Sequence, residues 1–439
     1  MELPSAKNRD GDAPNAARSA AGFGTRLIAL GQLPPFTPRQ QRVFLIALTA
    51  GFFDQYDRAL LSLALKQIQT ALRIAESSLG AMLSLIRLGF ALSLLVTPLA
   101  DVFGRRRLLL YTIVGYTVFT AISAIAPGDR SFVASQVIAR AFAGAEATIA
   151  LVILVEEVDA NNRGWAVGML AAVASCGDAL AAVAFMVINE IPYGWRGLYA
   201  IALVPLALLI PLRRILPESH RFEAQELAHA APPAIWDPMR RLFRAHPGRL
   251  AMMLMVAFLA AAGGNTAGLF LSKFLQEVHG YSPSKVSLLF LAGGGLGIAG
   301  NVFAGRLSDQ LGRRSMGALF NLLAPLVTIM AYSTTGFSVV AAVPLAMFAY
   351  TAGATILAAY STELFPTSYR STAGAALMVA GTIGGATGLL LETVLYHFTH
   401  SHWTSVRYLE VIWMLAPAIM MFLPETAGRE LEDISPETV

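Results

Sequence analysis

The stretch LADVFGRRR at positions 99–107 returns almost unchanged as LSDQLGRR at positions 307–314. The two aspartates, Asp101 and Asp309, are 309 − 101 = 208 positions apart. Each copy connects two apolar runs of about 20 residues, which is the length of helix that crosses a bilayer. The sequence therefore predicts one membrane-spanning bundle that occurs twice, and such duplication is typical of secondary transporters.

Two further motifs support the duplication. The segment 156–163, which begins with Glu and ends with Arg, corresponds to 363–370 at an offset of 363 − 156 = 207 positions. The tripeptides at 217–219 and 424–426 share the offset 424 − 217 = 207. Both copies of each motif fall on the same side of the predicted bilayer. The halves are therefore predicted to be parallel repeats, related by an axis along the membrane normal.

Composition places most of the surface of this chain in lipid. Of its 439 residues, 56% are hydrophobic and 14% are charged, and the mean hydropathy is +0.59. Soluble domains carry about 25% charged residues. The 32 Lys and Arg residues cluster in the links between apolar runs rather than along one face. This distribution argues against a nucleic-acid-binding surface.

The sequence predicts neither a cofactor nor a metal. A single cysteine, Cys176, excludes a disulfide framework and a cysteine-rich metal site. His397, His400 and His402 crowd one loop, but no helix pattern or acidic cluster supports a metal site there. No Gly-x-x-x-x-Gly-Lys-Ser/Thr loop occurs, so ATP is not the expected energy source. No motif brings together a nucleophile, a base and an orienting residue, so we do not expect an enzyme.

Twelve apolar runs predict an all-α membrane protein built from two six-helix repeats. They cover residues 43–66, 79–100, 107–126, 131–155, 165–189, 196–215, 249–272, 284–305, 313–333, 338–360, 371–395 and 407–423. The predicted domains are a disordered cytoplasmic tail (1–40), an N-terminal bundle (41–216), a cytoplasmic linker (217–248), a C-terminal bundle (249–424) and a second cytoplasmic tail (425–439). The linker stands out because it is polar and rich in proline.

Lys and Arg predict the orientation, because they are more frequent on the cytoplasmic side of membrane proteins. With both termini inside, the cytoplasmic side holds most of the 32 basic residues, whereas the reverse orientation would put this excess outside. We therefore expect a monomeric, multi-pass protein of the plasma membrane. Its expected partners are the lipid bilayer, protons and a small-molecule substrate.

The duplicated motifs predict a latch on the cytoplasmic side. A glycine in each copy permits a tight turn, and the arginines can reach carboxylates and helix C-termini nearby. The predicted gate residues are Asp101, Gly104, Arg105, Arg106, Glu156, Arg163, Glu218, Asp309, Gly312, Arg313, Glu363, Arg370 and Glu425. Exposed ion pairs contribute about 0–1 kcal/mol each, which suits contacts that break and form again during transport. The alternative is that these residues only fix the topology and contact lipid head groups.

Seven charged residues inside predicted spans are the candidates for function, because a charge at mid-bilayer costs at least about 2.5–3.5 kcal/mol. All belong to the first half: Asp54, Asp57, Arg58, Arg87, Arg140, Glu146 and Asp178. Asp54 shares a helix face with Asp57 and Arg58, three and four positions on. The four acids are the expected proton-coupling residues, with Asp57 or Asp54 first. The alternative is static pairing, of Asp54 with Arg58 and of Glu146 with Arg87 or Arg140.

Arginine is well suited to a carboxylate substrate, because its guanidinium binds both oxygens at once. Arg58, Arg87 and Arg140 are therefore expected to bind a small organic anion, unless they only neutralise the neighbouring acids. In the second half, Asn265 and Tyr350 offer an amide and an aromatic ring to an aromatic or polyol substrate. Lys273 and Glu392 are expected near the outer surface.

Several of these motifs resemble those of the major facilitator superfamily, and the resemblance extends over all twelve spans. Asp101-x-x-Gly104-Arg105-Arg106-Arg107 is similar to the loop that joins the second and third helices of that family. Five further motifs resemble those of the sugar-porter and metabolite–proton symporter branches of that family. They are Arg140-x-x-x-Gly144, Glu156…Arg163-Gly164, Pro217-Glu218-Ser219, Glu363-Leu364-Phe365-Pro366…Arg370 and Pro424-Glu425-Thr426.

The resemblance also implies a substrate class. Asp54-x-x-Asp57 resembles the paired aspartates of aromatic acid–proton symporters. Gly177 is followed by Asp178 rather than by proline, which departs from drug–proton antiporters. These matches imply proton-coupled symport of a small organic anion, such as an aromatic carboxylate, by alternating access. The alternatives are a proton-coupled or facilitative sugar or polyol carrier and, in another class, a non-transporting solute receptor on the same fold.

Overall fold

A computed structural model describes residues 36–100, 104–158, 162–201, 203, 236–366 and 369–429. Every regular element in this part of the chain is a helix. The predicted gate residues Asp101 and Glu218 lie outside the described residues, and so does most of the predicted linker. Arg163 begins a helix, but its side chain is also outside the described part.

The helices follow the order of the predicted spans. Those of the first half are α1 (Pro38–Leu63), α2 (Leu65–Leu72), α3 (Leu79–Gly89), α4 (Ser93–Val96), α6 (Arg105–Ala124), α7 (Asp129–Glu157), α8 (Arg163–Met186) and α9 (Trp195–Ala200), with short 3-10 turns at η1 (Glu76–Ser78), η2 (Phe90–Leu92) and η3 (Thr97–Leu99). Those of the second half are α12 (Trp236–Ala245), α13 (Pro247–Glu277), α14 (Pro283–Leu311), α15 (Arg313–Ala331), α16 (Phe337–Glu363), α17 (Arg370–Thr399), α18 (His402–Trp413) and α19 (Leu415–Met420).

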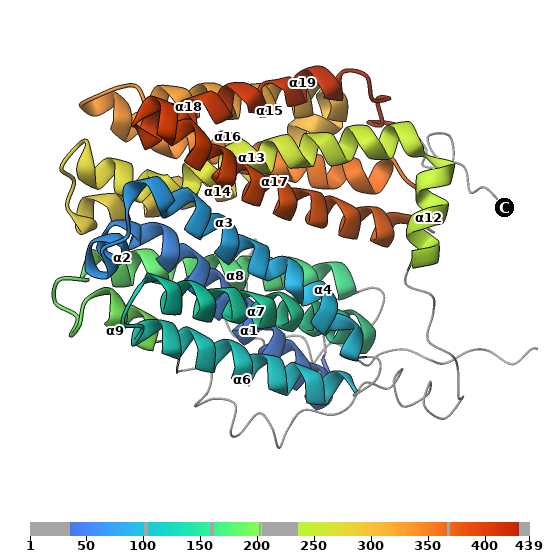
Figure 1. The fold of residues 1–439 in the computed structure, drawn as a ribbon. Coiled ribbons are helices and arrows are strands. Elements are labelled where there is room, and N and C mark those ends of the chain that lie inside the picture. Colours follow the sequence, from blue (N-terminus) through green and yellow to red (C-terminus); the bar gives the residue numbers. More distant parts are fainter. Residues whose placement is uncertain are drawn as a thin grey trace, which may run out of the picture.

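Each half packs mainly on itself, as Figure 1 shows by the separation of the blue-to-green helices from the yellow-to-red ones. In the first half α1 packs against α8 and α6 against α7, while in the second half α13 packs against α17 and α14 against α16. The halves meet where α3 packs on α17, α1 on α13 and α8 on α14. The division into two bundles and its boundaries remain predictions.

The two ends of the bundle have different cores. We call them the α2 end and the α12 end, after the helices that lie there (Figure 1). At the α2 end one buried cluster joins both halves, with Tyr56 and Phe132 of the first half in the same cluster as Phe270 and Tyr332 of the second. Toward the α12 end, one buried cluster contains only first-half residues and another only second-half residues. Apolar packing therefore joins the halves chiefly at the α2 end.

Glycine makes both copies of the duplicated turn possible. Gly104 precedes α6 with φ 90°, and Gly312 precedes α15 with φ 104°. These values lie in a region that glycine enters at little cost. A Cβ at Gly312 would also lie 2.5 Å from Oε2 of Glu425. Gly312 ends α14 and begins α15, and Gly104 begins α6 at the equivalent place in the first half.

Nine helices in the described ranges are long and apolar enough to cross a membrane. They correspond to predicted spans two to five and seven to eleven. The first predicted span forms α1, whose apolar stretch is interrupted by Asp54, Asp57 and Arg58. The sixth is described only as far as residue 203, and the twelfth is divided at Met414 between α18 and α19.

Candidate functional site

Helices α1 and α7 bring four of the predicted site residues into one cluster. Arg140 of α7 reaches across to α1, where its Nη2 lies 2.9 Å from Oδ2 of Asp57. Its Nη1 lies 3.8 Å from Oδ1 of Asp54. Arg58 pairs with Asp54 one turn away along α1. The structure thus shows the Asp54–Arg58 pair, and it pairs Arg140 with aspartates rather than with Glu146.

The Asp57–Arg140 pair is buried. Asp57 is 1% exposed and Arg140 is 5% exposed. Although the distance is that of an ion pair, the contact lacks hydrogen-bond geometry, and neither oxygen of Asp57 has a hydrogen-bond partner among the described residues. A buried ion pair needs such additional bonds to offset the cost of removing two charges from water. This pair is therefore poised to exchange its partners.

The other members of the cluster face an accessible space. The side chain of Arg58 is 50% exposed. Asp178 of α8 is exposed too, and it accepts a hydrogen bond from Nε2 of Gln55 at 3.2 Å. Charged side chains inside a membrane bundle face its interior or a water-filled cavity. Arg58 and Asp178 therefore mark a place that a solute from water can reach, beside the buried pair.

Arg87 extends from the first half toward the second. It lies on α3, and its Nε is buried with no hydrogen-bond partner in the described part of the chain. Its guanidinium lies against α17 at Gly385, where a Cβ would lie 2.2 Å from that nitrogen. Arg87 therefore occupies the interface between the halves, where its charge interacts with those of Arg58 and Arg140.

The charge of Glu146 interacts with that of Asp54 in the cluster, whereas Asn265 and Tyr350 belong to the second half. Glu146 is buried on α7, and its Oε2 has no hydrogen-bond partner among the residues described. The amide of Asn265 donates to the carbonyl of Ala261 at 3.0 Å, one turn away on its own helix. Tyr350 is exposed, and its ring lies edge-on to Trp413 with 6.0 Å between the centroids. Of these, Tyr350 is the side chain open to a ligand.

The expectation that all intramembrane charges belong to the first half is wrong. Glu410 lies inside the predicted span 407–423, and Glu392 lies inside 371–395. Both are fully buried in the second half. Neither carboxyl oxygen of Glu410 has a hydrogen-bond partner within the described ranges. The signal for Glu410 in the sequence is an acidic residue within an apolar run.

The predicted gate residues form one cluster in each half near the α12 end. In the first half Arg105 pairs with Glu156, and Arg106 follows in the same helical turn. In the second half Arg313 pairs with Asp309 at 2.5 Å and with Glu363 at 3.1 Å. Each of these pairs lies within one half, so pairing between the halves in another conformation remains a prediction. Arg370 donates to the carbonyl of Phe365 at 3.3 Å.

Glu425 closes the second-half cluster by capping α15. Its carboxylate accepts hydrogen bonds from the backbone N–H of Arg313 at 2.7 Å and of Arg314 at 3.2 Å. Burial raises the pKa of Glu425, but the backbone N–H groups of residues 427, 314, 426 and 313 lower it more, and the net pKa lies below its usual value. A carboxylate at a helix N-terminus is favoured by the helix dipole as well.

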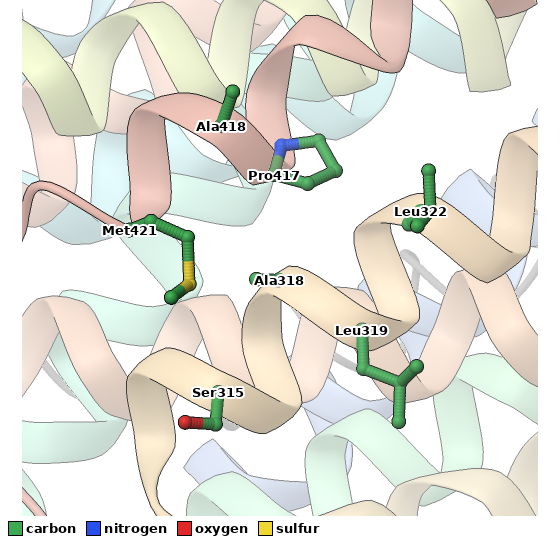
Figure 2. A pocket seen from close by; sticks show the side chains of 7 residues that line it. All are labelled: Ser315, Ala318, Leu319, Leu322, Pro417, Ala418 and Met421. Carbon is green, nitrogen blue, oxygen red and sulfur yellow. The ribbon is translucent and has the colours of Figure 1, made fainter.

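A hollow of about 390 Å³ lies in the second half. Figure 2 shows its lining, which comes from α15, including Ser315 and Leu319, from α19, including Pro417, and from Met421 just after α19. The lining is apolar apart from one hydroxyl, and none of the predicted site residues contributes to it. Because no charged side chain lines this hollow, we do not assign the predicted anionic substrate to it. No group of three or more His, Cys, Asp or Glu side chains in the described part could hold a metal ion.

Comparisons with known proteins agree on one family. The model of the Major Facilitator Superfamily matches residues 47–389 and, in a second match, residues 253–437. A probable 4-methylmuconolactone transporter of Cupriavidus pinatubonensis is 24% identical over 423 residues, which cover 91% of this chain and 94% of the relative. The 3-(3-hydroxy-phenyl)propionate transporter of Escherichia coli is 26% identical over 353 residues, which cover 79% and 84%.

The fold has a close counterpart among solved structures. The inward-open xylose transporter XylE of E. coli superimposes with a TM-score of 0.72 at 18% sequence identity. The match covers 90% of this chain and 99% of the other. At this identity the likeness establishes the all-helical fold and says nothing of the substrate.

Proposed function

This chain belongs to the major facilitator superfamily and is a multi-pass secondary transporter, not an enzyme. From that premise we propose that it carries a small organic anion together with a proton by alternating access, and that an aromatic carboxylate is the substrate class. The observation that carries the proposal is the buried ion pair between Asp57 and Arg140, next to the exposed Arg58.

Charge balance supports the proposed coupling between substrate and proton. Asp54, Asp57, Arg58 and Arg140 together carry two negative and two positive charges. A substrate carboxylate would add an uncompensated negative charge in a place of low polarity, where such a charge is costly. If a proton binds Asp57 at the same time, Arg140 is released to pair with the substrate and the cluster stays neutral. Substrate and proton would then enter and leave together.

The substrate class is supported by the side chains around the cluster. Two exposed or interfacial arginines, Arg58 and Arg87, can bind a carboxylate through both of its oxygens. The ring of Tyr350 is exposed in the second half and can pack against an aromatic ring. The named substrate of the E. coli relative, a hydroxyphenyl propionate, combines a carboxylate with an aromatic ring.

We also propose that the α12 end faces the cytoplasm. Arg240, Arg241 and Arg244 of α12 join the basic turns before α6 and α15 at this end, and basic residues are retained on the inner side. In a background with Cys176→Ser, an impermeant thiol reagent added outside intact cells should label Thr335→Cys at the α2 end and spare Ala245→Cys at the α12 end. The opposite labelling would reverse the orientation.

Uptake into proteoliposomes tests the coupling. With 3-(3-hydroxyphenyl)propionate as the probe, an imposed pH gradient should drive accumulation of up to about tenfold per pH unit for one proton per substrate. Because one anion and one proton carry no net charge, a membrane potential set by K⁺ and valinomycin should not change the accumulation. Potential-driven uptake of xylose would instead support a sugar–proton carrier, and a protein that moves no solute would be a receptor.

The variant Asp57→Asn is the matched test of the proposed proton site. It should exchange labelled for unlabelled substrate across the membrane, because the neutral amide imitates a protonated carboxyl. It should fail to concentrate substrate under a pH gradient. The control is Asp129→Asn, which also removes one negative charge but at an exposed site at the start of α7. Gln55→Glu would not serve as a control, because it adds a charge. Accumulation by Asp57→Asn at the wild-type level would refute the assignment.

A further inference from the structure

Four charged or titratable side chains from four elements meet at the α2 end, and none of them belongs to the Asp57–Arg140 pair. We call His402, Glu76, Glu392 and Lys273 the His402 cluster. Glu76 comes from η1 in the first half, and the other three come from α18, α17 and α13 in the second half. The start of α18 lies at the same end of the bundle as α2 (Figure 1).

Both ring nitrogens of His402 contact carboxylates. Nδ1 lies 2.6 Å from Oε1 of Glu392, and Nε2 lies 2.8 Å from Oε2 of Glu76. Lys273 donates to both oxygens of Glu76, at 3.0 and 3.1 Å, and also to Glu277 at 2.8 Å. Lys273 and Glu392 are 0% exposed, and His402 is also buried. Only Glu76 keeps a partly exposed side chain.

These contacts require one proton more than a neutral histidine and two carboxylates possess. An ionised carboxylate only accepts hydrogen bonds, and a neutral imidazole has only one N–H to donate. Two hydrogen bonds to two carboxylates therefore need the imidazolium form, or else a protonated carboxyl. The charged groups are Lys273 and the carboxylates of Glu76, Glu392 and Glu277, so with a neutral His402 the net charge is −2. In either case the extra proton changes this net charge to −1. Burial favours this smaller charge.

The extra proton depends on contact between the halves. If the first half moves away at this end, Glu76 leaves His402, and the remaining bond to Glu392 can be made by a neutral imidazole with one N–H. The surrounding contacts indicate that this end is closed in the structure. Nε2 of Gln67 donates to Oε1 of Gln276 at 2.7 Å, and the hydroxyl of Ser272 donates to the carbonyl of Leu63 at 2.6 Å.

We propose that His402, Glu76 and Glu392 form a proton-binding site that is complete only when the α2 end is closed. Binding of a proton there stabilises the closed form of this end. In the proposed orientation this is the outer side, so external acid favours the conformation that is closed to the outside. The inference rests on alternating access in the proposed function, but not on the substrate or on proton coupling at Asp57.

The groups packed around His402 are compatible with this role. Glu392 and Tyr396 face it from α17, with 4.3 Å between the ring centroids of Tyr396 and His402. Phe270 stacks on it from α13 at 4.9 Å. Lys273 is the one positive charge in the cluster, and its bonds to Glu76 and Glu277 neutralise part of the acidic charge that holds the proton.

Distances between spin labels across the α2 end test the proposal in the full chain. Glu190→Cys in the first half and Thr335→Cys in the second are exposed and outside both proposed sites, and the background carries Cys176→Ser. In lipid nanodiscs without substrate, the ratio of short to long distances should rise as the pH falls from about 8.5 to about 5.5, the range in which histidine titrates. For one linked proton the rise is at most about tenfold per pH unit.

Variants test which side chain is responsible for the pH dependence of the distances. His402→Gln should abolish the pH dependence, whereas His397→Gln, which changes an exposed histidine in the last turn of α17, should keep it. If His402→Gln does not fold, Glu76→Ala removes the acceptor across the interface and should abolish the pH dependence as well. Wild-type distances that do not change with pH would overturn the proposal, and so would an undiminished dependence in His402→Gln.

Asp57→Asn separates this proposal from the proposed function. If the cluster binds the proton, Asp57→Asn keeps the pH-dependent distances even though it no longer concentrates substrate. Loss of the pH dependence in Asp57→Asn would assign the effect to the central pair and contradict the His402 cluster. If Asp57→Asn loses proton-coupled accumulation but keeps the pH-dependent distances, the result supports both the proton site at Asp57 and the one at the His402 cluster.

Discussion

At the scale of single residues, the central feature is a buried pair of opposite charges. Asp57 and Arg140 are each buried, and their ion pair is not supported by hydrogen bonds from other described residues. The cost of burying each charge is therefore balanced mainly by the other. In the proposed function this dependence makes the pair responsive to a proton and to a substrate carboxylate. It also makes the stability of the protein sensitive to removal of either partner.

A double-mutant cycle measures this dependence. Arg140→Gln leaves Asp57 buried and unpaired and should lower the free energy of unfolding by about 3–5 kcal/mol. Adding Asp57→Asn removes the uncompensated charge, so the double variant should recover most of that loss. Denaturant unfolding in detergent at neutral pH measures both effects. A double variant that is as unstable as Arg140→Gln would show that the pair contributes little to folding.

A second prediction concerns Arg87 and the glycine against which it lies. A Cβ at Gly385 would lie 2.2 Å from Nε of Arg87, a flexible side chain that can move aside. Gly385→Ala should therefore fold normally but raise the KM for a carboxylate substrate several-fold, because Arg87 is displaced. Gly374→Ala on the same helix has open space around it and is the matched control. Equal KM values in the two variants would remove Arg87 from the substrate site.

Sequence alone predicts local pairs better than distant ones. The spacing of Asp54 and Arg58 predicts their contact, because residues four apart on a helix are neighbours. Asp57 and Arg140 come from different helices, so their pairing depends on how α1 and α7 pack. The contacts of His402 with Glu76 and Glu392 are likewise tertiary, and the sequence indicates only a crowded histidine loop.

At the scale of elements, the duplicated turns are the most predictable feature. Glycine followed by arginine begins a helix in both halves, and both glycines have positive φ. The division of the last predicted span is harder to foresee. Pro417 lacks an N–H, and its ring crowds the carbonyl of Trp413, which accounts for the break between α18 and α19 at Met414. Yet Pro325 and Pro344 lie inside continuous helices, so proline alone does not predict a break.

The start of α15 gives a prediction for pH. The pKa of Glu425 is lower in the folded protein than in the unfolded chain, so its ionised form stabilises the fold above the ordinary glutamate pKa. That contribution is lost as the pH falls below about 4.5 and through the lowered pKa. Thermal unfolding should therefore show Glu425→Gln less stable than wild type at neutral pH, with the difference narrowing in acid. Glu190→Gln, in an exposed turn, is the control and should show no such narrowing.

At the scale of the whole molecule, the two ends differ in how the halves meet. The predicted membrane fold and its duplicated architecture agree with the superfamily match and with the all-helical structure. The conformation was not predictable, because one sequence must support several arrangements of the same two halves. The structure holds the halves together at the α2 end through one shared core and through hydrogen bonds such as that between Gln67 and Gln276. Alternating access requires these contacts to separate in each cycle.

A reversible cross-link at this place tests that requirement. Gln67→Cys and Gln276→Cys, in a background with Cys176→Ser, should react with a short, reducible bifunctional thiol reagent, because the native side chains meet at 2.7 Å. The linked protein should lose transport completely, since the α2 end can no longer open, and reduction of the link should restore it. The reagent should leave each single-cysteine variant active. Full transport in the linked protein would mean that the halves need not part at Gln67 and Gln276, and the opening would then have to be sought elsewhere along the interface of α3 with α17 or of α8 with α14.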